Sequence, residues 1–379
     1  MKSKMKIVYC ISGTYNSGGM ERVLANKANY LTSRGFDVTI ITTDQRGQNS
    51  YFPLDPRIKC MDLSINYEEN NGKSIVNKIL CYPWKQLRHR RKLTAELKEI
   101  QPDVAVSMFC NDAEFLYKIK DGSKKVLEIH FCRFKRLQYS RKGLWGVVDK
   151  FRSWYDAKIV SRYDRFVTLT HEDKKYWGNL DNSVVIPNAQ TFVCDAPARL
   201  DSKIVLAVGR YTYQKGFDML LEAWAKVCKQ VDDWCLRIVG DGELWEDHQR
   251  QVNELEIVDR VQMSHSTKNI IDEYQAASML VMSSRYEGFG MVLLEAQSAG
   301  LPTISFDCKC GPSEIISNGR NGYLVPGNDI ENLSRRIIEL IENPELRIQM
   351  GRCSYEDSKR FSEETVMCMW EKLFNDVVR

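Results

Sequence analysis

The sequence has no run of about 20 consecutive apolar residues, the length that a membrane-spanning helix requires. The apolar run after the basic N-terminus, residues 7–11, is too short for a secretion signal. The twelve cysteines are scattered, and we interpret the one close pair, Cys308 and Cys310, as ordinary loop cysteines rather than metal ligands. No repeat of solenoid or propeller period is present. These absences predict a cytoplasmic protein with reduced thiols.

The charge is divided unevenly along the chain. Its 379 residues exceed the roughly 250–300 at which single cores stop growing, so we expect two domains. Residues 1–190 hold 33 Lys and Arg against 20 Asp and Glu, and subtraction from the totals of 54 and 50 leaves 21 against 30. The first part thus carries +13 and the rest −9. This asymmetry indicates that the first domain meets an anionic partner.

The stretch 284–295 carries the strongest functional signal. Apolar residues 279–282 predict a buried strand before it, and residues 291–298 predict a helix after a loop with two glycines. A helix N-terminus reached through such a loop directs backbone N–H groups and a positive dipole end at one point, where an anion binds favourably. Glu287 and Glu295 add carboxylates that bind hydroxyls, so the pattern indicates a nucleotide sugar. The alternative interpretation is a tight turn with two solvated glutamates.

A second strand, loop and helix are predicted over residues 204–230. The loop contains Arg210 and Lys215, two cations that can bracket one diphosphate, because arginine offers a bidentate fork and lysine a point charge. The alternative is a pair of solvated loop cations. A third unit of this kind begins the chain, with a glycine-rich loop at 13–19. That loop lacks the Gly-x-Gly-x-x-Gly spacing, which disfavours a nicotinamide dinucleotide.

A basic helix is predicted over residues 83–100. Between Trp84 and Leu93 it mixes bulky apolar residues with five cations, so we expect Trp84 and Leu87 to lie against an anionic membrane surface. The mixture recurs over 131–145. A solvated basic face is the alternative, and no nucleic-acid motif accompanies the charge, so we expect no nucleic-acid partner.

His130 directly follows the strand predicted over residues 125–129. Open α/β sheets bind ligands at the carboxyl ends of their parallel strands. This position makes His130 a candidate cleft residue, and local packing is the alternative.

Taken in order, the motifs resemble those of glycosyltransferase family 4, whose members are retaining enzymes of GT-B fold. The matching motifs are Gly18-Gly19-Met20-Glu21-Arg22, Pro187-Asn188, Gly209-Arg210 with Lys215-Gly216, Gly240-Asp241-Gly242, Glu287-Gly288-Phe289-Gly290, Glu295, Gly300-Leu301-Pro302 and Asn321-Gly322-Tyr323-Leu324-Val325. The resemblance implies an α/β protein with two Rossmann-like domains across a deep cleft. We expect an acceptor-binding domain over 1–190, a nucleotide-sugar-binding domain over 200–355, and a C-terminal helix over 356–379 that crosses back to the first domain.

The resemblance also implies roles for single residues. Arg210 and Lys215 would neutralise the diphosphate leaving group, Glu287 would face the donor sugar and Glu295 the ribose. The implied donor-binding set is Gly18, Gly19, Arg210, Lys215, Glu287, Phe289, Gly290, Met291, Val292 and Glu295, and the implied catalytic set is Glu287, His130, Arg210 and Lys215. His130 matches the family's cleft histidine by position, with Phe131 where the family often has an aspartate.

The implied reaction is retaining transfer of a hexose from a UDP-sugar to a lipid-linked glycan, in cell-surface polysaccharide or glycan synthesis. Fixed cations and helix amides stabilise the leaving diphosphate, so we expect neither a metal nor another cofactor. The expected location is the cytoplasm, peripheral on the inner face of the cell membrane. Two alternatives stay open: a sugar-nucleotide epimerase of similar fold, and a non-catalytic nucleotide-sugar-binding protein.

Overall fold

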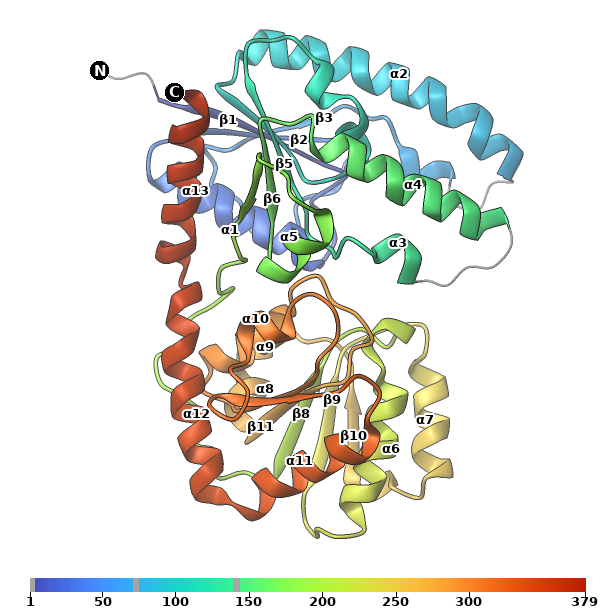
Figure 1. Cartoon of the computed structure of the whole chain (residues 1–379), viewed down its shortest axis with the longest axis vertical. Helices are drawn as coiled ribbons and strands as arrows, with labels where there is room; N and C mark the ends of the chain where they lie inside the picture. The colour runs from blue at the N-terminus through green and yellow to red at the C-terminus, as the bar shows by residue number, and fades with distance from the viewer. Residues whose placement is uncertain (1–3, 71–74, 139–143) are drawn as a thin grey trace. The chain divides into compact units, whose positions relative to one another are not determined.

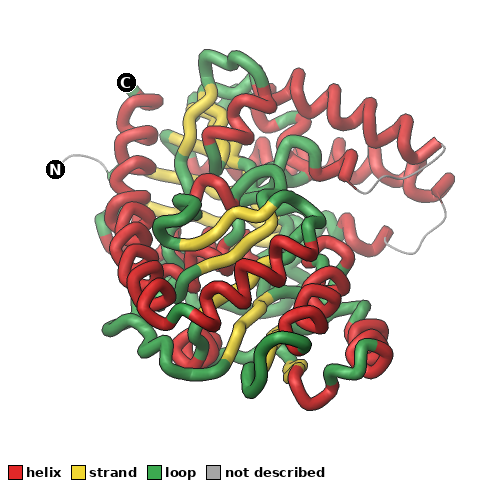
Figure 2. The backbone as a smooth tube through the Cα atoms, turned by 60° about the horizontal axis from the view of Figure 1, so that its bottom comes forward, coloured by secondary structure: helices red, strands yellow, loops and turns green. Residues whose placement is uncertain are grey.

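The computed structural model describes residues 4–70, 75–138 and 144–379 (Figure 1). The chain divides into two compact units: unit 1 comprises Met1–Ala189 with Glu364–Arg379, and unit 2 comprises Gln190–Glu363. Each unit holds one β-sheet in which every paired strand runs parallel. Helices (red in Figure 2) cover the strands (yellow), as parallel sheets with helical crossovers require.

Unit 1 contains a seven-stranded sheet in the order β3-β2-β1-β4-β5-β6-β7. The strands are β1 (Lys6–Ile11), β2 (Asp37–Thr42), β3 (Lys59–Asp62), β4 (Val104–Ser107), β5 (Lys124–Glu128), β6 (Arg165–Thr168) and β7 (Ser183–Val185). The α-helices are α1 (Gly19–Ser33), α2 (Ile75–Ile100), α3 (Lys135–Gln138), α4 (Leu144–Val160), α5 (His171–Trp177) and the C-terminal α13 (Glu363–Val378). The strand order reverses between β1 and β4, which leaves a crevice at the carboxyl edge of the sheet.

The side chains of β1 alternate between two cores, one on each face of the sheet. Tyr9 and Ile11 pack with α1 and α13, whereas Val8 and Cys10 pack with α2 and α4. Trp370 of α13 is 2% exposed and belongs to the first of these cores. The last helix of the chain, which runs along unit 1 in Figure 1, is therefore part of the core of this unit.

Helix α2 begins at Ile75, whereas the sequence predicts a start at Pro83. Proline has no N–H to donate and usually lies in the first turn, but here it lies inside the helix. Trp84 and Leu87 are exposed, whereas Leu93 is fully buried in the core. Only the outward face of the predicted membrane-binding stretch is therefore available to a partner. Within the described ranges, no helix combines the length and the apolar character needed to cross a bilayer.

Unit 2 contains a six-stranded sheet in the order β10-β9-β8-β11-β12-β13. The strands are β8 (Ile204–Val208), β9 (Cys235–Val239), β10 (Val261–Ser264), β11 (Met279–Met282), β12 (Thr303–Phe306) and β13 (Gly322–Val325). The α-helices are α6 (Phe217–Cys228), α7 (Trp245–Glu254), α8 (Ile270–Ala276), α9 (Met291–Ser298), α10 (Pro312–Ile315), α11 (Ile330–Glu342) and α12 (Pro344–Ser358). Here the order reverses between β8 and β11, so the loops after these two strands border the crevice of this sheet.

Candidate active site

The two loops that border the crevice of unit 2 are joined by hydrogen bonds. They are residues 209–216, after β8, and residues 283–290, after β11. The Arg285 N–H donates to the Gln214 carbonyl at 2.8 Å, and Gln214 Nε2 donates to the Tyr286 carbonyl at 3.0 Å. The two loops that the sequence singles out therefore form one structure at the edge where parallel sheets bind ligands.

Lys215 and Glu287 form an ion pair at the centre of this structure. Lys215 Nζ lies 2.7 Å from Glu287 Oε1, and the side chains are 14% and 9% exposed. Ser284 Oγ donates to the same oxygen at 2.7 Å. A Cβ on Gly209 would lie 3.0–3.2 Å from the methylene groups of Lys215, so the glycine leaves room for the lysine stem. The ammonium is thus held in one place before any ligand arrives.

The N-terminus of α9 opens at the end of the second loop. Gly290 is the cap residue, with φ 91° in the left-handed region that favours glycine, and no side chain caps the helix. The first N–H groups of a helix have no partner within it, so those of Met291 and Val292 are available to an anion. Phe289 is buried, with its ring centre 5.7 Å from that of Phe361. It can therefore contact a ligand only through its backbone.

Glu295 already accepts hydrogen bonds from hydroxyl groups. It is 7% exposed, Thr191 Oγ1 donates to its Oε1 and the Tyr274 hydroxyl donates to its Oε2, each at 2.8 Å. Sequence reasoning misses both partners, because they lie on other elements and carry no motif. The carboxylate has the chemistry expected for a ribose-binding group, and both of its oxygens are engaged.

The two cations that the sequence pairs, Arg210 and Lys215, have different surroundings. Arg210 is exposed, and the described residues place no carboxylate within ion-pair distance of it. Arg285, which sequence reasoning passes over, makes a bidentate pair with Asp218 at 2.9 and 2.6 Å. Burial of Asp218 acts to raise the pKa of its carboxyl, but Arg285 outweighs it and the pKa is lowered. Arg285 therefore ties the second loop to the first turn of α6.

In unit 1, Gly18 and Gly19 lie at the corresponding position, after β1. Gly18 is the cap residue of α1, and a Cβ on it would lie 2.3 Å from Glu21 Oε2. Among the residues that the structure describes, none has an atom within 4 Å of a Cβ built on Gly19. A carboxylate in the first turn already interacts favourably with the helix dipole. The space beside Gly19 is therefore open, whereas the Glu21 side chain occupies the space beside Gly18.

A cavity of about 320 Å³ lies at the same edge of unit 1. Its lining includes Tyr82, Phe109, Asn111, Glu114, Arg152 and Asp156. Aromatic groups with a few placed polar groups are typical of small-molecule sites, and the volume is at the lower end of their range. Phe109 has φ 55°, an uncommon backbone conformation for a bulky residue that is often found at functional sites.

His130 lies just beyond β5, beside a buried ion pair. Its Nε2 is 3.0 Å from Glu128 Oε1, the oxygen that also pairs with Lys27 Nζ. Burial acts to raise the pKa of Glu128, but Lys27 and His130 outweigh it and lower the pKa to about 2. The Lys27 ammonium lies 3.7 Å from the centre of the Trp370 ring. The predicted cleft histidine is therefore placed by charged groups from α1 and β5, and α13 covers the lysine.

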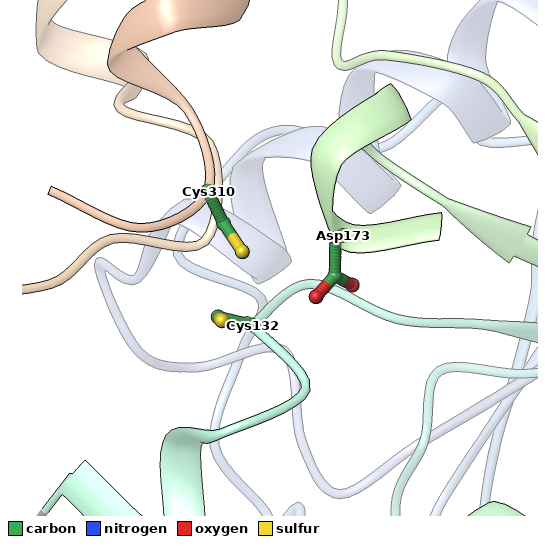
Figure 3. Close-up of side chains that lie close together, drawn as sticks. All are labelled: Cys132, Asp173 and Cys310. Carbon is green, nitrogen blue, oxygen red and sulfur yellow. The ribbon is translucent and has the colours of Figure 1, made fainter. Parts of the chain in front are cut away.

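Three side chains with metal-ligating chemistry are drawn in Figure 3: Cys132 and Asp173 of unit 1 and Cys310 of unit 2. The Asp173 carboxylate accepts hydrogen bonds from the Arg133 N–H at 2.8 Å and from the Trp177 indole at 3.0 Å. These contacts explain the placement of Asp173 within unit 1. Because Cys310 belongs to the other unit, we assign no metal site to the three.

Two families match this chain, one in each unit. Residues 194–357 match Glycosyl transferases group 1, and residues 17–189 match Glycosyltransferase Family 4. An uncharacterized glycosyltransferase of Haemophilus influenzae is 30% identical over 370 residues, which cover 97% of this chain and 99% of that protein. The amylovoran biosynthesis glycosyltransferase AmsD of Erwinia amylovora is 27% identical over 392 residues, which cover 98% and 99%.

Among solved structures, a mutant of S. aureus TarM in complex with fondaparinux, alpha-GlcNAc-glycerol and UDP has a TM-score of 0.78 to this chain. The match covers 98% of this chain and 100% of that one at 15% identity. The likeness to this structure is one of fold.

Proposed function

The chain belongs to glycosyltransferase family 4 and has the predicted GT-B fold, and on this premise we propose that it is a retaining transferase that uses a UDP-sugar. The acceptor in this proposal is a lipid-linked glycan, and the pathway is the synthesis of a cell-surface polysaccharide or glycan. Two comparisons support the donor and the pathway: UDP is bound in the TarM structure, and AmsD is named for amylovoran biosynthesis.

One observation carries the proposal: the Lys215–Glu287 pair lies between the two loops of the unit 2 crevice, and the second loop leads into the uncapped N-terminus of α9. A diphosphate bound there would meet a fixed ammonium and backbone N–H groups. Charge-assisted hydrogen bonds of this kind are about twice as strong as neutral ones. The groups need no rearrangement as charge develops, which is the condition for strong electrostatic catalysis.

The chemistry of the step follows from these groups. The bond between the anomeric carbon and the UDP oxygen breaks, and an acceptor hydroxyl forms the new bond on the same face of the sugar. The hydroxyl proton passes to the phosphate oxygen of the departing UDP. Negative charge grows on the leaving phosphate, where Lys215 and the α9 amides stabilise it. Glu287 orients Lys215 and faces the donor sugar, Glu295 faces the ribose, and Arg210 reaches the diphosphate from solvent. With these charges in place, the proposed step uses no metal.

We assign acceptor binding to unit 1 and membrane contact to the outward face of α2. Residues 1–190 carry +13, which suits an anionic partner. Trp84 and Leu87 are 73% and 42% exposed, and Arg88 and Arg91 are exposed beside them. An outward face of aromatic, aliphatic and cationic side chains is typical of interfacial helices. In this proposal the protein is cytoplasmic and peripheral on the inner face of the cell membrane, and His130 belongs to the catalytic groups.

The experiment that tests the donor site is thermal unfolding with UDP, GDP, ADP or CMP, each in EDTA. A ligand that binds only the folded protein raises the melting temperature as its concentration rises above its dissociation constant. We expect a clear shift with UDP. A larger shift with another diphosphate would correct the donor class, and no shift with any of them would contradict the donor site.

The retaining step is tested separately, by NMR of the product. The enzyme is given a UDP-sugar of known anomeric configuration, and the new glycosidic bond is examined before it can equilibrate. We expect the configuration of the donor to be kept. An inverted product would contradict the retaining assignment and leave the donor site standing.

A further inference from the structure

Helix α4 turns an apolar face to solvent. Val147, Phe151 and Trp154 expose 63%, 61% and 50% of their surface. Residues at positions i, i+4 and i+7 lie on one side of a helix, so these three form a single strip. The rings of Phe151 and Trp154 support each other, with centres 5.6 Å apart. Contiguous exposed apolar groups mark a surface that meets a partner or a membrane.

The acidic residues of α4 are buried and its basic residues are exposed. Asp149 and Asp156 are buried, whereas Lys150, Arg152 and Lys158 are exposed. Lys158 Nζ lies 3.8 Å from the centre of the Trp154 ring, which places a cation directly beside the strip. Over residues 146–160, where the structure describes the side chains of α4, the outward face thus presents apolar and cationic groups and no carboxylate.

The outward face of α2 has the same composition, and the two helices border one cavity. Tyr82 of α2 and Arg152 of α4 both line the space of about 320 Å³ at the carboxyl edge of the sheet. The helices run side by side in both views of the chain (Figures 1 and 2). Both helices also pack on the core at one face of the sheet. The α4 strip and the outward face of α2 therefore lie on the same side of unit 1.

We propose that the α4 strip, with Lys150 and Lys158, binds the surface of a bilayer that contains anionic phospholipids. The aromatic side chains enter the interfacial layer, and the lysines meet the head-group phosphates. A second copy of the same face would bring like charges together, which disfavours a symmetric contact between two chains. The inference adds a second contact helix to the proposed function and rests on it only for the lipid-linked acceptor.

A two-helix contact also gives the cavity a role. When the α4 strip and the outward face of α2 both lie on the bilayer, the cavity bordered by the two helices lies next to the head groups. A sugar carried on a lipid phosphate is presented at that level. A single contact helix would leave unit 1 free to rotate about it, whereas two fix its orientation.

The test is sedimentation of the full chain with vesicles of phosphatidylglycerol and phosphatidylcholine in equal parts, and of phosphatidylcholine alone. The double variant Phe151→Ser/Trp154→Ser is expected to lower the partition coefficient on the mixed vesicles by roughly tenfold or more. Val258→Ser is the matched control, because Val258 is 54% exposed in unit 2, and it should change nothing. Lys150→Gln/Lys158→Gln should weaken binding to the mixed vesicles only, and Lys120→Gln, at an exposed site elsewhere in unit 1, is its control.

Two results would overturn the inference. One is wild-type partitioning of Phe151→Ser/Trp154→Ser, because the strip would then contribute no membrane contact. The other is light scattering that shows a wild-type dimer and a monomeric double variant, because the strip would then be a protein interface. The UDP melting shift reads out the donor site separately. If UDP does not raise the melting temperature of the wild-type protein, the proposed function is contradicted, while the vesicle result stands.

Discussion

The two units each contain a buried lysine–glutamate pair, and we assign the two pairs different roles. Lys27 and Glu128 in unit 1 are 4% and 1% exposed, and the Trp370 ring covers the ammonium. Lys215 and Glu287 in unit 2 are 14% and 9% exposed and belong to loops beyond the ends of β8 and β11. The chemistry is the same, but only the second pair consists of loop residues at the carboxyl edge of a sheet.

We infer that the position of each pair relative to its sheet sets its role. In a pair buried between a helix and a strand, the Coulomb attraction is largely offset by the desolvation cost, and the pair fixes the two elements relative to each other. In our proposal, a pair on two loops at the point where the strand order reverses keeps a cation in place for a ligand. We therefore expect opposite consequences when the two pairs are broken: mainly lost stability in unit 1 and mainly lost turnover in unit 2.

The largest effect on stability is expected from Glu128→Gln. It leaves the Lys27 ammonium buried without its carboxylate, and breaking a buried pair costs about 3–5 kcal/mol of unfolding free energy. Urea unfolding measures the loss. The double variant Lys27→Met/Glu128→Gln removes both charges and should recover most of it.

Glu287→Gln is the matched change in unit 2. It should cost less than half as much stability, because loop residues can relax toward water, and it should reduce turnover sharply. Equal stability losses for Glu128→Gln and Glu287→Gln would break the distinction between the two pairs.

The next largest effect is a pH dependence at Asp112. Like Glu128 it is buried in unit 1, but here burial dominates and raises the pKa of the carboxyl to about 7. The unfolded chain loses this proton near pH 4, so between pH 4 and 7 the folded state binds more protons and the unfolding free energy falls as pH rises. Asp112→Asn removes this contribution, and its stability relative to wild type should rise by on the order of 3 kcal/mol between pH 4 and 8.

Urea unfolding at several pH values measures the Asp112 effect. Asparagine leaves an amide in a buried site, which changes the unfolding free energy by an amount that does not depend on pH. The prediction therefore concerns the slope of the unfolding free energy against pH. Parallel stability curves for wild type and Asp112→Asn would contradict it.

The smallest effect is expected from Glu295→Gln. A neutral amide accepts a hydroxyl hydrogen bond less strongly than a carboxylate, so UDP should bind roughly tenfold more weakly. Calorimetry with UDP and with its 2′,3′-dideoxy analogue separates ribose contact from general damage. The analogue should bind the variant as tightly as it binds the wild type. Equal losses of affinity for UDP and for the analogue would contradict the ribose role.

The elements around the proposed donor site could be predicted closely. The strand over 279–282 and the helix over 291–298 have the predicted bounds, because the strand is one continuous apolar run and Gly290 and Gly300 lie beside the helix. No strand is predicted over 59–62, where β3 lies at the sheet edge with mostly exposed residues and no apolar pattern. No helix is predicted over 144–160, because the outward apolar strip of α4 blurs the periodicity.

The partners of the site residues could not be predicted from local patterns. Lys215 contacts Glu287 across two loops, and Tyr274 reaches Glu295 from α8, so tertiary contacts choose these partners. The same holds for His130, whose neighbour Glu128 is paired with a lysine on α1. The second mixture of bulky apolar and basic residues spans 131–145, and positions 139–143 of it lie outside the described ranges.

The central claim is that the Lys215 ammonium binds the donor diphosphate in unit 2. Titration calorimetry with UDP in EDTA, on wild type and on Lys215→Ala, tests it most directly. We expect UDP to bind the wild-type protein and to bind the variant about 10- to 100-fold more weakly, the range for a charge-assisted hydrogen bond, with unchanged circular dichroism. Equal dissociation constants for the two folded proteins would contradict the claim.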